Sequence, residues 1–182
     1  THFYGYLQAP SGHILGLVSP HPVASWSVEY NLGYQDPAPH WFMGHRIESL
    51  NIDLLNALPL PERNPQNLWM LEPGESKRWI IAMVDVDNPD SFENQVYSLI
   101  DAPVIRIPQT TYLPEEKAVF EVLSSSDDIK VTDDEGKELP VEIKSMRGSV
   151  KQVSCVLPRT GLYRICAFSG DKVAEGIISA HA

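Results

Sequence analysis

Residues 150–168 read VKQVSCVLPRTGLYRICAF and decide the fold class of the chain. Two stretches of alternating apolar and polar residues, Val150–Leu157 and Leu162–Phe168, flank the segment Pro158–Gly161. Alternation with a period of two is typical of half-buried strands, and Pro and Gly favour a turn between them. The stretch therefore predicts two antiparallel strands joined as a hairpin.

The two cysteines of the chain, Cys155 and Cys166, lie in these two predicted strands. If Arg159 pairs with Leu162, the two sulfur atoms lie across the ladder from each other, and a register shifted by two makes them diagonal neighbours. Both a disulfide and two buried thiols fit this arrangement. Two cysteines are too few for a disulfide scaffold and lack the paired spacing of a zinc site.

Alternating stretches and turn signals recur through the rest of residues 101–182. In the turn Asp133–Gly136, for example, the glycine supplies a positive φ. Six or seven short strands within about 75 residues predict an antiparallel β-sandwich. The other strands are expected at Ala118–Leu123, Ile129–Thr132, Leu139–Ile143 and Val173–Ser179.

The approach to the second predicted hairpin strand, Pro158–Tyr163, resembles that of immunoglobulin-like domains, in which a tyrosine packs near the final strands. Tyr163 precedes Cys166 by three residues, whereas antibody domains have a spacing of about two. The resemblance implies a general Ig-like sandwich for residues 101–182 rather than an antibody domain.

Residues 1–100 are also predicted to be mostly β-structure, and they contain 10 of the 15 prolines and all four tryptophans. Trp79–Val86 is a continuous apolar run, which favours a strand buried on both faces. The turn Leu71–Glu75 has Pro and Gly in the positions that favour type II. A short helix is expected at Ile52–Leu58, and the joint between two domains at residues 101–108. The remaining strands are expected at His13–Ser19, Val23–Tyr30, Gly44–Leu50 and Leu68–Leu71.

The chain carries 24 acidic and 14 basic side chains, which gives a net charge of −10. Nucleic-acid binding needs clustered Lys and Arg, so no nucleic-acid partner is expected. The longest apolar stretches fall far short of the ~20 residues of a membrane helix, so no membrane span is expected. No Gly-rich phosphate loop occurs, and we expect no cofactor.

The chain begins at Thr1 and shows no signal peptide, which is typical of a processed or truncated product. The compartment is left open, with a periplasmic or extracellular location favoured.

The order of features in residues 12–86 leads to a second resemblance. An aromatic strand at Trp26–Tyr30 is followed by Arg46–Leu50, an irregular Pro/Asn segment, and Leu71–Ser76 before the apolar run. This order is similar to the C-terminal part of galactose-mutarotase-like proteins, the aldose 1-epimerase superfamily. The resemblance implies a supersandwich-like β-sandwich portion and a carbohydrate ligand.

The same resemblance places Glu48 at the position of the family's catalytic glutamate, with Ser49-Leu50 where Thr-Gln often follows. The family's catalytic histidine belongs to an upstream half that this chain does not contain. The resemblance therefore implies a missing N-terminal half or a partner chain.

Residues 30–48 form the densest cluster of aromatic and polar residues in the chain. Sugars present C–H faces that stack on aromatic rings and hydroxyls that bond carboxylates, amides and guanidinium groups. Gly33 and two prolines favour a loop, where binding residues are frequent. Alternatively, the aromatic residues cover the end of a small sandwich. The candidate ligand-binding residues are Trp26, Asn31, Tyr34, Asp36, Trp41 and Arg46.

Glu48 with His40 or His45 is the candidate acid–base pair, which would deprotonate an anomeric hydroxyl and protonate the ring oxygen. These residues match no strong metal-ligand motif, and we expect no metal. Asp85, Asp87 and Asp90 resemble a loose acidic calcium loop, but a solvated turn after a strand explains them as well. Nucleophilic catalysis has no support, because no Gly-x-Ser-x-Gly elbow occurs and neither cysteine has a basic, exposed-looking context.

The sequence thus predicts an all-β protein, with an antiparallel, supersandwich-like β-sandwich portion over residues 1–100 and a smaller Ig-like sandwich over residues 101–182. It favours a non-catalytic carbohydrate-binding or accessory module of a glycan-processing system. One alternative is part of an epimerase-like or lyase-like enzyme that uses Glu48. Another is a structural subunit that docks a partner chain through the aromatic loop 30–48.

Overall fold

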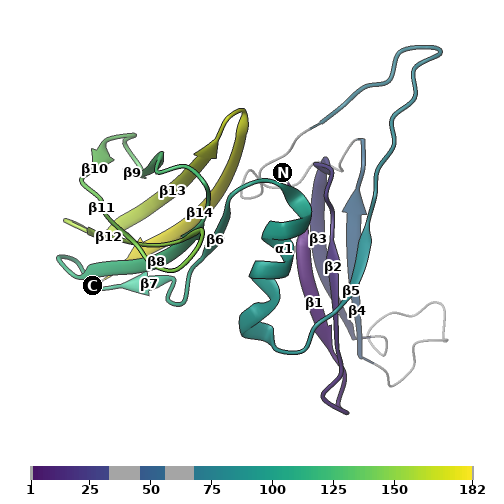
Figure 1. Ribbon diagram of the computed structural model, residues 1–182, viewed down its shortest axis with the longest axis horizontal. Helices are drawn as coiled ribbons and strands as arrows, with labels where there is room; N and C mark the ends of the chain where they lie inside the picture. The colour runs from purple at the N-terminus through teal and green to yellow at the C-terminus, as the bar shows by residue number, and fades with distance from the viewer. Residues whose placement is uncertain (1, 33–45, 56–67, 182) are drawn as a thin grey trace. The chain divides into compact units, whose positions relative to one another are not determined.

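The chain forms two compact units, Thr1–Asp85 and Val86–Ala182, both built mainly from β-strands (Figure 1). The computed structural model describes residues 2–32, 46–55 and 68–181, and it describes residues 28–32 and 46–49 by their backbone alone. The expected all-β fold is confirmed. Within the described ranges, no helix has the length and apolarity to cross a membrane.

The first unit contains a three-stranded antiparallel sheet and a two-stranded antiparallel ribbon. In the sheet, β2 lies between β1 and β5, and the ribbon pairs β3 with β4. The strands expected at His13–Ser19, Val23–Tyr30 and Gly44–Leu50 are confirmed, with shifts of a few residues at their ends. The bounds are β1 Tyr4–Gln8, β2 Ile14–Val18, β3 Ser25–Leu32, β4 Arg46–Asp53 and β5 Ala82–Asp85.

Alternation along β2 determines which face of the three-stranded sheet is buried. Ile14 and Val18 are buried, whereas Leu15 is exposed. Phe3, just before β1, is also buried, and its ring centroid lies 5.7 Å from that of Trp26 in β3. This aromatic contact joins the sheet to the ribbon within the first unit.

The apolar run Trp79–Val86 does not form the doubly buried strand that we expected. β5 occupies only the second half of the run, and it pairs with β2 at the edge of the described sheet. Met83 is 73% exposed, and Ile80 and Ile81 before the strand are exposed as well. A continuous apolar run indicates that a strand is suited to burial, but the described part of the unit covers one face of β5 only.

Two other predictions for the first unit were wrong. Leu68–Leu71 forms no strand, because the described backbone offers it no ladder partner beyond one hydrogen bond from the Trp69 N–H to the Leu55 carbonyl. The expected helix Ile52–Leu58 is absent where the structure describes it, since Ile52 and Asp53 end β4. Residues 56–58 lie outside the described ranges.

The second unit is a sandwich of two sheets. One sheet has the strand order β11-β12-β8-β6, and the other has the order β10-β9-β13-β14-β7, in which β7 runs parallel to β14. The strands expected at Ala118–Leu123, Ile129–Thr132 and Val173–Ser179 are confirmed as β8, β9 and β14. The strand expected at Leu139–Ile143 is instead divided into β10 and β11, which belong to different sheets. The bounds are β6 Val104–Arg106, β7 Thr111–Tyr112, β8 Lys117–Leu123, β9 Ile129–Asp133, β10 Glu138–Leu139, β11 Glu142–Ser145, β12 Val150–Val156, β13 Gly161–Ser169 and β14 Lys172–Ala180.

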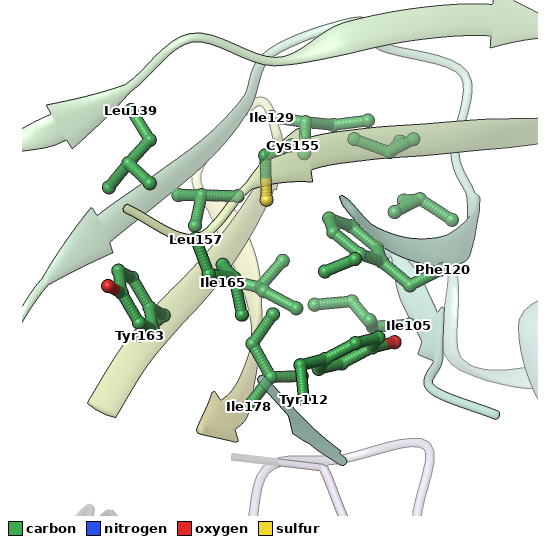
Figure 2. Close-up of a cluster of buried hydrophobic side chains, with 14 of the residues drawn as sticks. Ile105, Tyr112, Phe120, Ile129, Leu139, Cys155, Leu157, Tyr163, Ile165 and Ile178 are labelled. Atoms are coloured by element: carbon green, nitrogen blue, oxygen red, sulfur yellow. The ribbon is translucent and has the colours of Figure 1, made fainter. Parts of the chain in front are cut away.

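Alternate residues of both sheets meet in one apolar layer, part of which Figure 2 shows. Phe120 of β8 and Leu157 after β12 come from one side, and Tyr163, Ile165 and Ile178 come from the other. All five side chains are at most 1% exposed. Burial of large apolar side chains on this scale, at about 1.5–3 kcal/mol each, dominates the folding free energy of a sandwich.

The strand orders match the immunoglobulin arrangement. Strands β6, β8, β12 and β11 correspond to the A, B, E and D strands of one sheet, and β9, β13 and β14 to the C, F and G strands of the other. The expected Ig-like sandwich is therefore confirmed by its topology.

A helix that the sequence analysis did not anticipate, α1 (Phe92–Ile100), precedes the sandwich strands and packs against β6. Its three buried residues, Phe92, Val96 and Ile100, recur every four positions, which is the spacing of one helical face. A 3-10 turn at Pro89–Ser91 leads into the helix, and the Asn88 side chain accepts a hydrogen bond from the Asp90 N–H. Residues 86–100 thus belong to the second compact unit.

Arg106 fixes this helix to the sandwich. Its guanidinium group bonds Glu93 of α1 at 3.3 Å, Glu121 of β8 at 2.9 Å and the Asp90 carbonyl at 3.1 Å. One planar cation therefore links the helix, the turn before it and the neighbouring strand.

The stretch of residues 150–168 does not form the predicted hairpin. β12 pairs with β8 and β11, whereas β13 pairs with β9 and β14, so the chain crosses from one sheet to the other at residues 157–160. At this crossing the Tyr163 hydroxyl donates to the Arg159 carbonyl (2.6 Å) and accepts from the Arg159 N–H (3.2 Å). This is the tyrosine corner of Ig-like domains.

Arg159 also ties the crossing to the turn after β9. Its guanidinium group lies 3.2 Å from an Asp133 oxygen, 2.7 Å from Asp134 and 3.2 Å from Glu135. A hydrogen bond from the Lys137 N–H, supported by Arg159, lowers the pKa of Asp133. The three carboxylates therefore hold the side chain of Arg159, and the tyrosine corner holds its backbone.

Both cysteines are free thiols, so the disulfide alternative was wrong. Cys155 faces the apolar layer, whereas Cys166 lies in the opposite sheet among outward-facing positions and is half-buried. Because the two strands belong to different sheets, the sulfur atoms are not cross-strand neighbours. Burial raises the pKa of the Cys155 thiol to about 11, and it also raises the pKa of Cys166.

The tyrosine corner predicts a specific loss of stability. Replacing Tyr163 by Phe removes both hydrogen bonds at Arg159, and we expect the free energy of unfolding of the second unit to fall by about 1–2 kcal/mol. Urea denaturation followed by circular dichroism, with hydrogen exchange of the β13 amides, measures this change.

Tyr112→Phe is the matched control, because the Tyr112 hydroxyl makes a longer bond of 3.4 Å to the Val119 carbonyl. We expect a smaller loss for this variant. Tryptophan fluorescence reports on the first unit, where all four tryptophans lie, and should be unchanged in both variants. Equal losses in Tyr112→Phe and Tyr163→Phe would contradict the tyrosine corner.

Separation of the cysteines predicts their reactivity. The thiolate is the reactive form, so the raised pKa and burial of Cys155 should keep it unreactive toward a disulfide reagent at pH 8, while Cys166 reacts slowly. Denaturant should expose two reactive thiols per chain, and Cys166→Ser should abolish the slow reaction of the folded chain with the disulfide reagent. A native chain that yields no thiol even after unfolding would show that the two cysteines are bonded.

Candidate functional site

Five of the predicted site residues fall in a segment that the structure does not describe. They are Tyr34, Asp36, His40, Trp41 and His45. Their roles remain predictions from the sequence.

The β3–β4 ribbon carries the other predicted residues on either side of that segment. Its ladder places Tyr30 directly opposite Glu48, Asn31 opposite Ile47, and Arg46 opposite Leu32. The ribbon therefore brings the backbone of Tyr30 and Glu48, 18 positions apart in the sequence, to adjacent positions. Arg46 and Asn31 lie at the end of the ribbon where residues 33–45 begin and end.

Trp26 is the predicted aromatic residue whose side chain the structure describes. It lies at the far end of β3 and is half-buried, with its ring tilted by 59° against that of the buried Phe3. This contact gives Trp26 a structural role in the first unit and leaves part of its surface accessible.

A second aromatic group, which the sequence analysis did not select, lies on the loop of residues 68–81. The Lys77 ammonium nitrogen lies 3.9 Å from the ring centroid of Trp69 and 5.2 Å from that of Trp79. Such cation–π contacts contribute about 0.5–1 kcal/mol each at exposed sites. We call Trp69, Lys77 and Trp79 the indole–lysine cluster.

Hydrogen bonds to backbone carbonyls fix the indole of Trp79 and the backbone of Trp69. The Trp79 indole N–H donates to the Pro22 carbonyl at 3.2 Å, and the Trp69 backbone N–H donates to the Leu55 carbonyl at 2.8 Å. Each tryptophan is thus attached to a different segment of the first unit, the β2–β3 connection and the end of β4. Trp69 remains 50% exposed.

The loop reverses direction at the predicted turn. The Glu75 N–H donates to the Glu72 carbonyl at 2.9 Å, and Gly74 has a φ of 90°, as a type II turn requires. The Glu75 carboxylate also accepts from the Glu72 N–H at 3.0 Å. Because the turn lies between Trp69 and Lys77, it brings the two halves of the cluster together; Figure 1 shows this long loop leading into β5.

The basic side chains at the cluster differ from those of the second unit in their ion pairing. Among the described residues, Lys77 and Arg78 form no ion pair, whereas seven of the ten Lys and Arg side chains of the second unit do. Neighbouring exposed side chains on the loop, Leu68 and Met70, are apolar. The cluster therefore presents flat aromatic surface beside a positive charge.

The structure gives no support to a metal site in its described residues, where no group of three or more His, Cys, Asp or Glu side chains converges. In the acidic segment after β5, the Asp90 backbone N–H caps onto Asn88, and Asp85 lies 3.8 Å from His13. These contacts explain that segment as a surface turn in which Asp90 is capped by Asn88 and Asp85 lies near His13.

No family model matches the chain, and no curated protein matches it. Among solved structures, a polysaccharide lyase is similar with a TM-score of 0.59 and 16% identity, over 98% of this chain and 24% of that chain. The Lin-41 filamin domain is similar with a TM-score of 0.38 and 14% identity, over 43% of this chain and 91% of that chain.

At these identities the likeness shows the fold alone. The match to the lyase extends over both units of this chain, so part of a larger polysaccharide lyase has a similar β-rich fold. This chain spans about a quarter of that lyase, as the 24% coverage shows. The resemblance to galactose-mutarotase-like proteins stays a prediction.

Proposed function

We propose that the chain is a non-catalytic carbohydrate-binding part of a polysaccharide-processing protein. The observation that carries this proposal is the indole–lysine cluster, in which the half-exposed ring of Trp69 contacts Lys77 and the Trp69 backbone is bonded to Leu55. A flat indole ring matches the C–H face of a pyranose, and little side-chain entropy is lost on binding because a tryptophan side chain has only two rotatable bonds.

Two further arguments support a carbohydrate ligand. The fold likeness to a polysaccharide lyase covers 98% of this chain, which is the likeness expected of an accessory β-sandwich portion in such an enzyme. The sequence independently places stacking and hydroxyl-bonding residues between positions 30 and 48, at the end of the β3–β4 ribbon. The proposed ligand is therefore a polysaccharide bound by the first unit.

A lyase-like or epimerase-like role for Glu48 is the second candidate. The backbone register favours it, because the ladder pairs the backbone of Glu48 with that of Tyr30, and both residue types can exchange protons with a sugar. His40 or His45 would complete the pair predicted from the sequence. This role requires the upstream half or partner chain that the mutarotase-like resemblance implies.

Binding is tested by isothermal titration calorimetry of the chain with a panel of soluble neutral and acidic polysaccharides. We expect saturable binding to at least one of them, and we expect Trp69→Ala to weaken it roughly fivefold to tenfold through loss of aromatic stacking. Trp41→Ala tests the predicted loop in the same way.

Met70→Ala is the matched control for Trp69→Ala, because it removes exposed apolar surface from the adjacent residue without removing an indole. Its affinity should equal that of the wild type. Absence of binding to every polysaccharide, or an equal loss in both variants, would reject the proposed function.

The second candidate is tested by activity. If Glu48 acts as a base, the wild type should cleave a polysaccharide to an unsaturated product or accelerate mutarotation of an aldose, and Glu48→Gln should lose this activity while keeping polysaccharide affinity. Ultraviolet absorbance and polarimetry measure the two reactions. Activity that survives in Glu48→Gln would exclude this residue as the base.

A further inference from the structure

We propose that the indole–lysine cluster binds a sugar unit that carries a carboxylate, with Trp69 contacting the sugar ring and Lys77 pairing with its carboxylate. This inference rests on the proposed function and names the ligand class: an acidic polysaccharide rather than a neutral one. Its basis is the position of one cation between two aromatic rings in an otherwise acidic chain.

The charge of Lys77 is available to a ligand. Its ammonium group contacts the indole rings of Trp69 and Trp79 and pairs with no carboxylate in the described ranges. An ammonium has three N–H donors, and the ring contacts leave donors that can reach a carboxylate. Arg78, next to it, is exposed and adds a second positive charge to the same loop.

The negative charge of the rest of the chain makes Lys77 important for attracting an acidic ligand. The chain carries a net charge of −10, which repels an acidic polysaccharide from most of its surface. In the second unit, Arg106, Arg159 and Lys172 are examples of cations already paired with carboxylates of the chain. The loop of residues 68–81 carries Lys77 and Arg78 together with Glu72 and Glu75, so its net charge is zero and it repels a carboxylate less than the acidic remainder of the chain does.

Preorganisation makes the cluster suitable for recognition. A free lysine side chain loses about 2 kcal/mol of conformational freedom when it is fixed. Here the contacts with two indole rings already restrict Lys77, while the bond to Pro22 fixes the indole of Trp79 and the bond to Leu55 fixes the backbone of Trp69. A ligand carboxylate would thus meet an ammonium group whose position is set in advance, beside an indole that is half exposed.

The test compares each polysaccharide with a form that lacks its charge. Polygalacturonate, alginate and hyaluronan are each titrated by calorimetry against the chain, alongside the same polymer after chemical reduction of its carboxyl groups. We expect binding to at least one acidic polymer, weakened roughly tenfold by carboxyl reduction, as for the loss of one charge-assisted hydrogen bond. Binding to the acidic form should also weaken as salt is raised from 50 to about 300 mM, because the attraction is screened.

Three variants assign the effect to Lys77. Lys77→Gln should lower the affinity for the acidic polymer roughly tenfold and leave the affinity for its reduced form unchanged. Lys77→Arg should retain binding, because it keeps a cation against the indoles. Lys144→Gln, which removes an exposed lysine of β11 in the second unit, is the charge control and should bind as the wild type does.

The outcomes separate this inference from the proposed function. Equal binding of acidic and reduced polymers, or unchanged affinity in Lys77→Gln, would overturn the carboxylate site while the carbohydrate-binding function stands. A Lys77→Gln variant that loses both forms equally would show that Lys77 only maintains the loop, and this too would overturn the inference. Absence of binding to any polymer would reject both.

Discussion

Burial of one apolar layer between two sheets is the constraint on which the second unit depends. Phe120, Leu157, Ile165 and Ile178 enter this layer from opposite sides and are almost fully buried. Because the layer needs both sheets, the chain must leave one sheet after β12 and enter the other at β13. The buried Tyr163 then has to satisfy its hydroxyl group, and it does so on the backbone of Arg159 at the crossing.

Ion pairs in the second unit follow from the same arrangement. Arg159 joins the crossing to the carboxylates after β9, and Arg106 joins α1 to β8, so each cation connects segments that the apolar layer has already brought together. Ion pairs at or near the surface contribute little each, about 0–1 kcal/mol. Their consequence is that the positive charges of this unit are mostly neutralised by the chain itself.

The first unit differs from the second in how its sheet is covered and in what its basic side chains contact. Its three-stranded sheet is covered on one face, with Ile14 and Val18 buried and Met83 exposed. On the loop before β5, the cation of Lys77 contacts aromatic rings instead of carboxylates. Accessible aromatic surface and a positive charge that pairs with no carboxylate of the described residues occur together there, which is why the proposed ligand site lies in this unit rather than in the sandwich.

Sequence patterns predicted those features that depend on near neighbours in the chain. Alternation located β2, β3, β8 and β13, and Pro73-Gly74 located the turn. Helix α1 was also within reach, since Phe92, Val96 and Ile100 recur every four residues after a proline. Alternation could not show that β12 and β13 belong to different sheets, because a hairpin strand and a crossing strand have the same pattern of inward and outward residues.

For the site, the sequence by itself determined which residues are present: four tryptophans in the first unit, basic residues next to Trp79 and a turn that reverses the chain. Only the tertiary structure decided that Lys77 lies between Trp69 and Trp79, while Trp26 packs on Phe3. The physical reason is that ring contacts depend on distances between segments. Those distances are set by hydrogen bonds to Pro22 and Leu55, residues far from the loop in the chain.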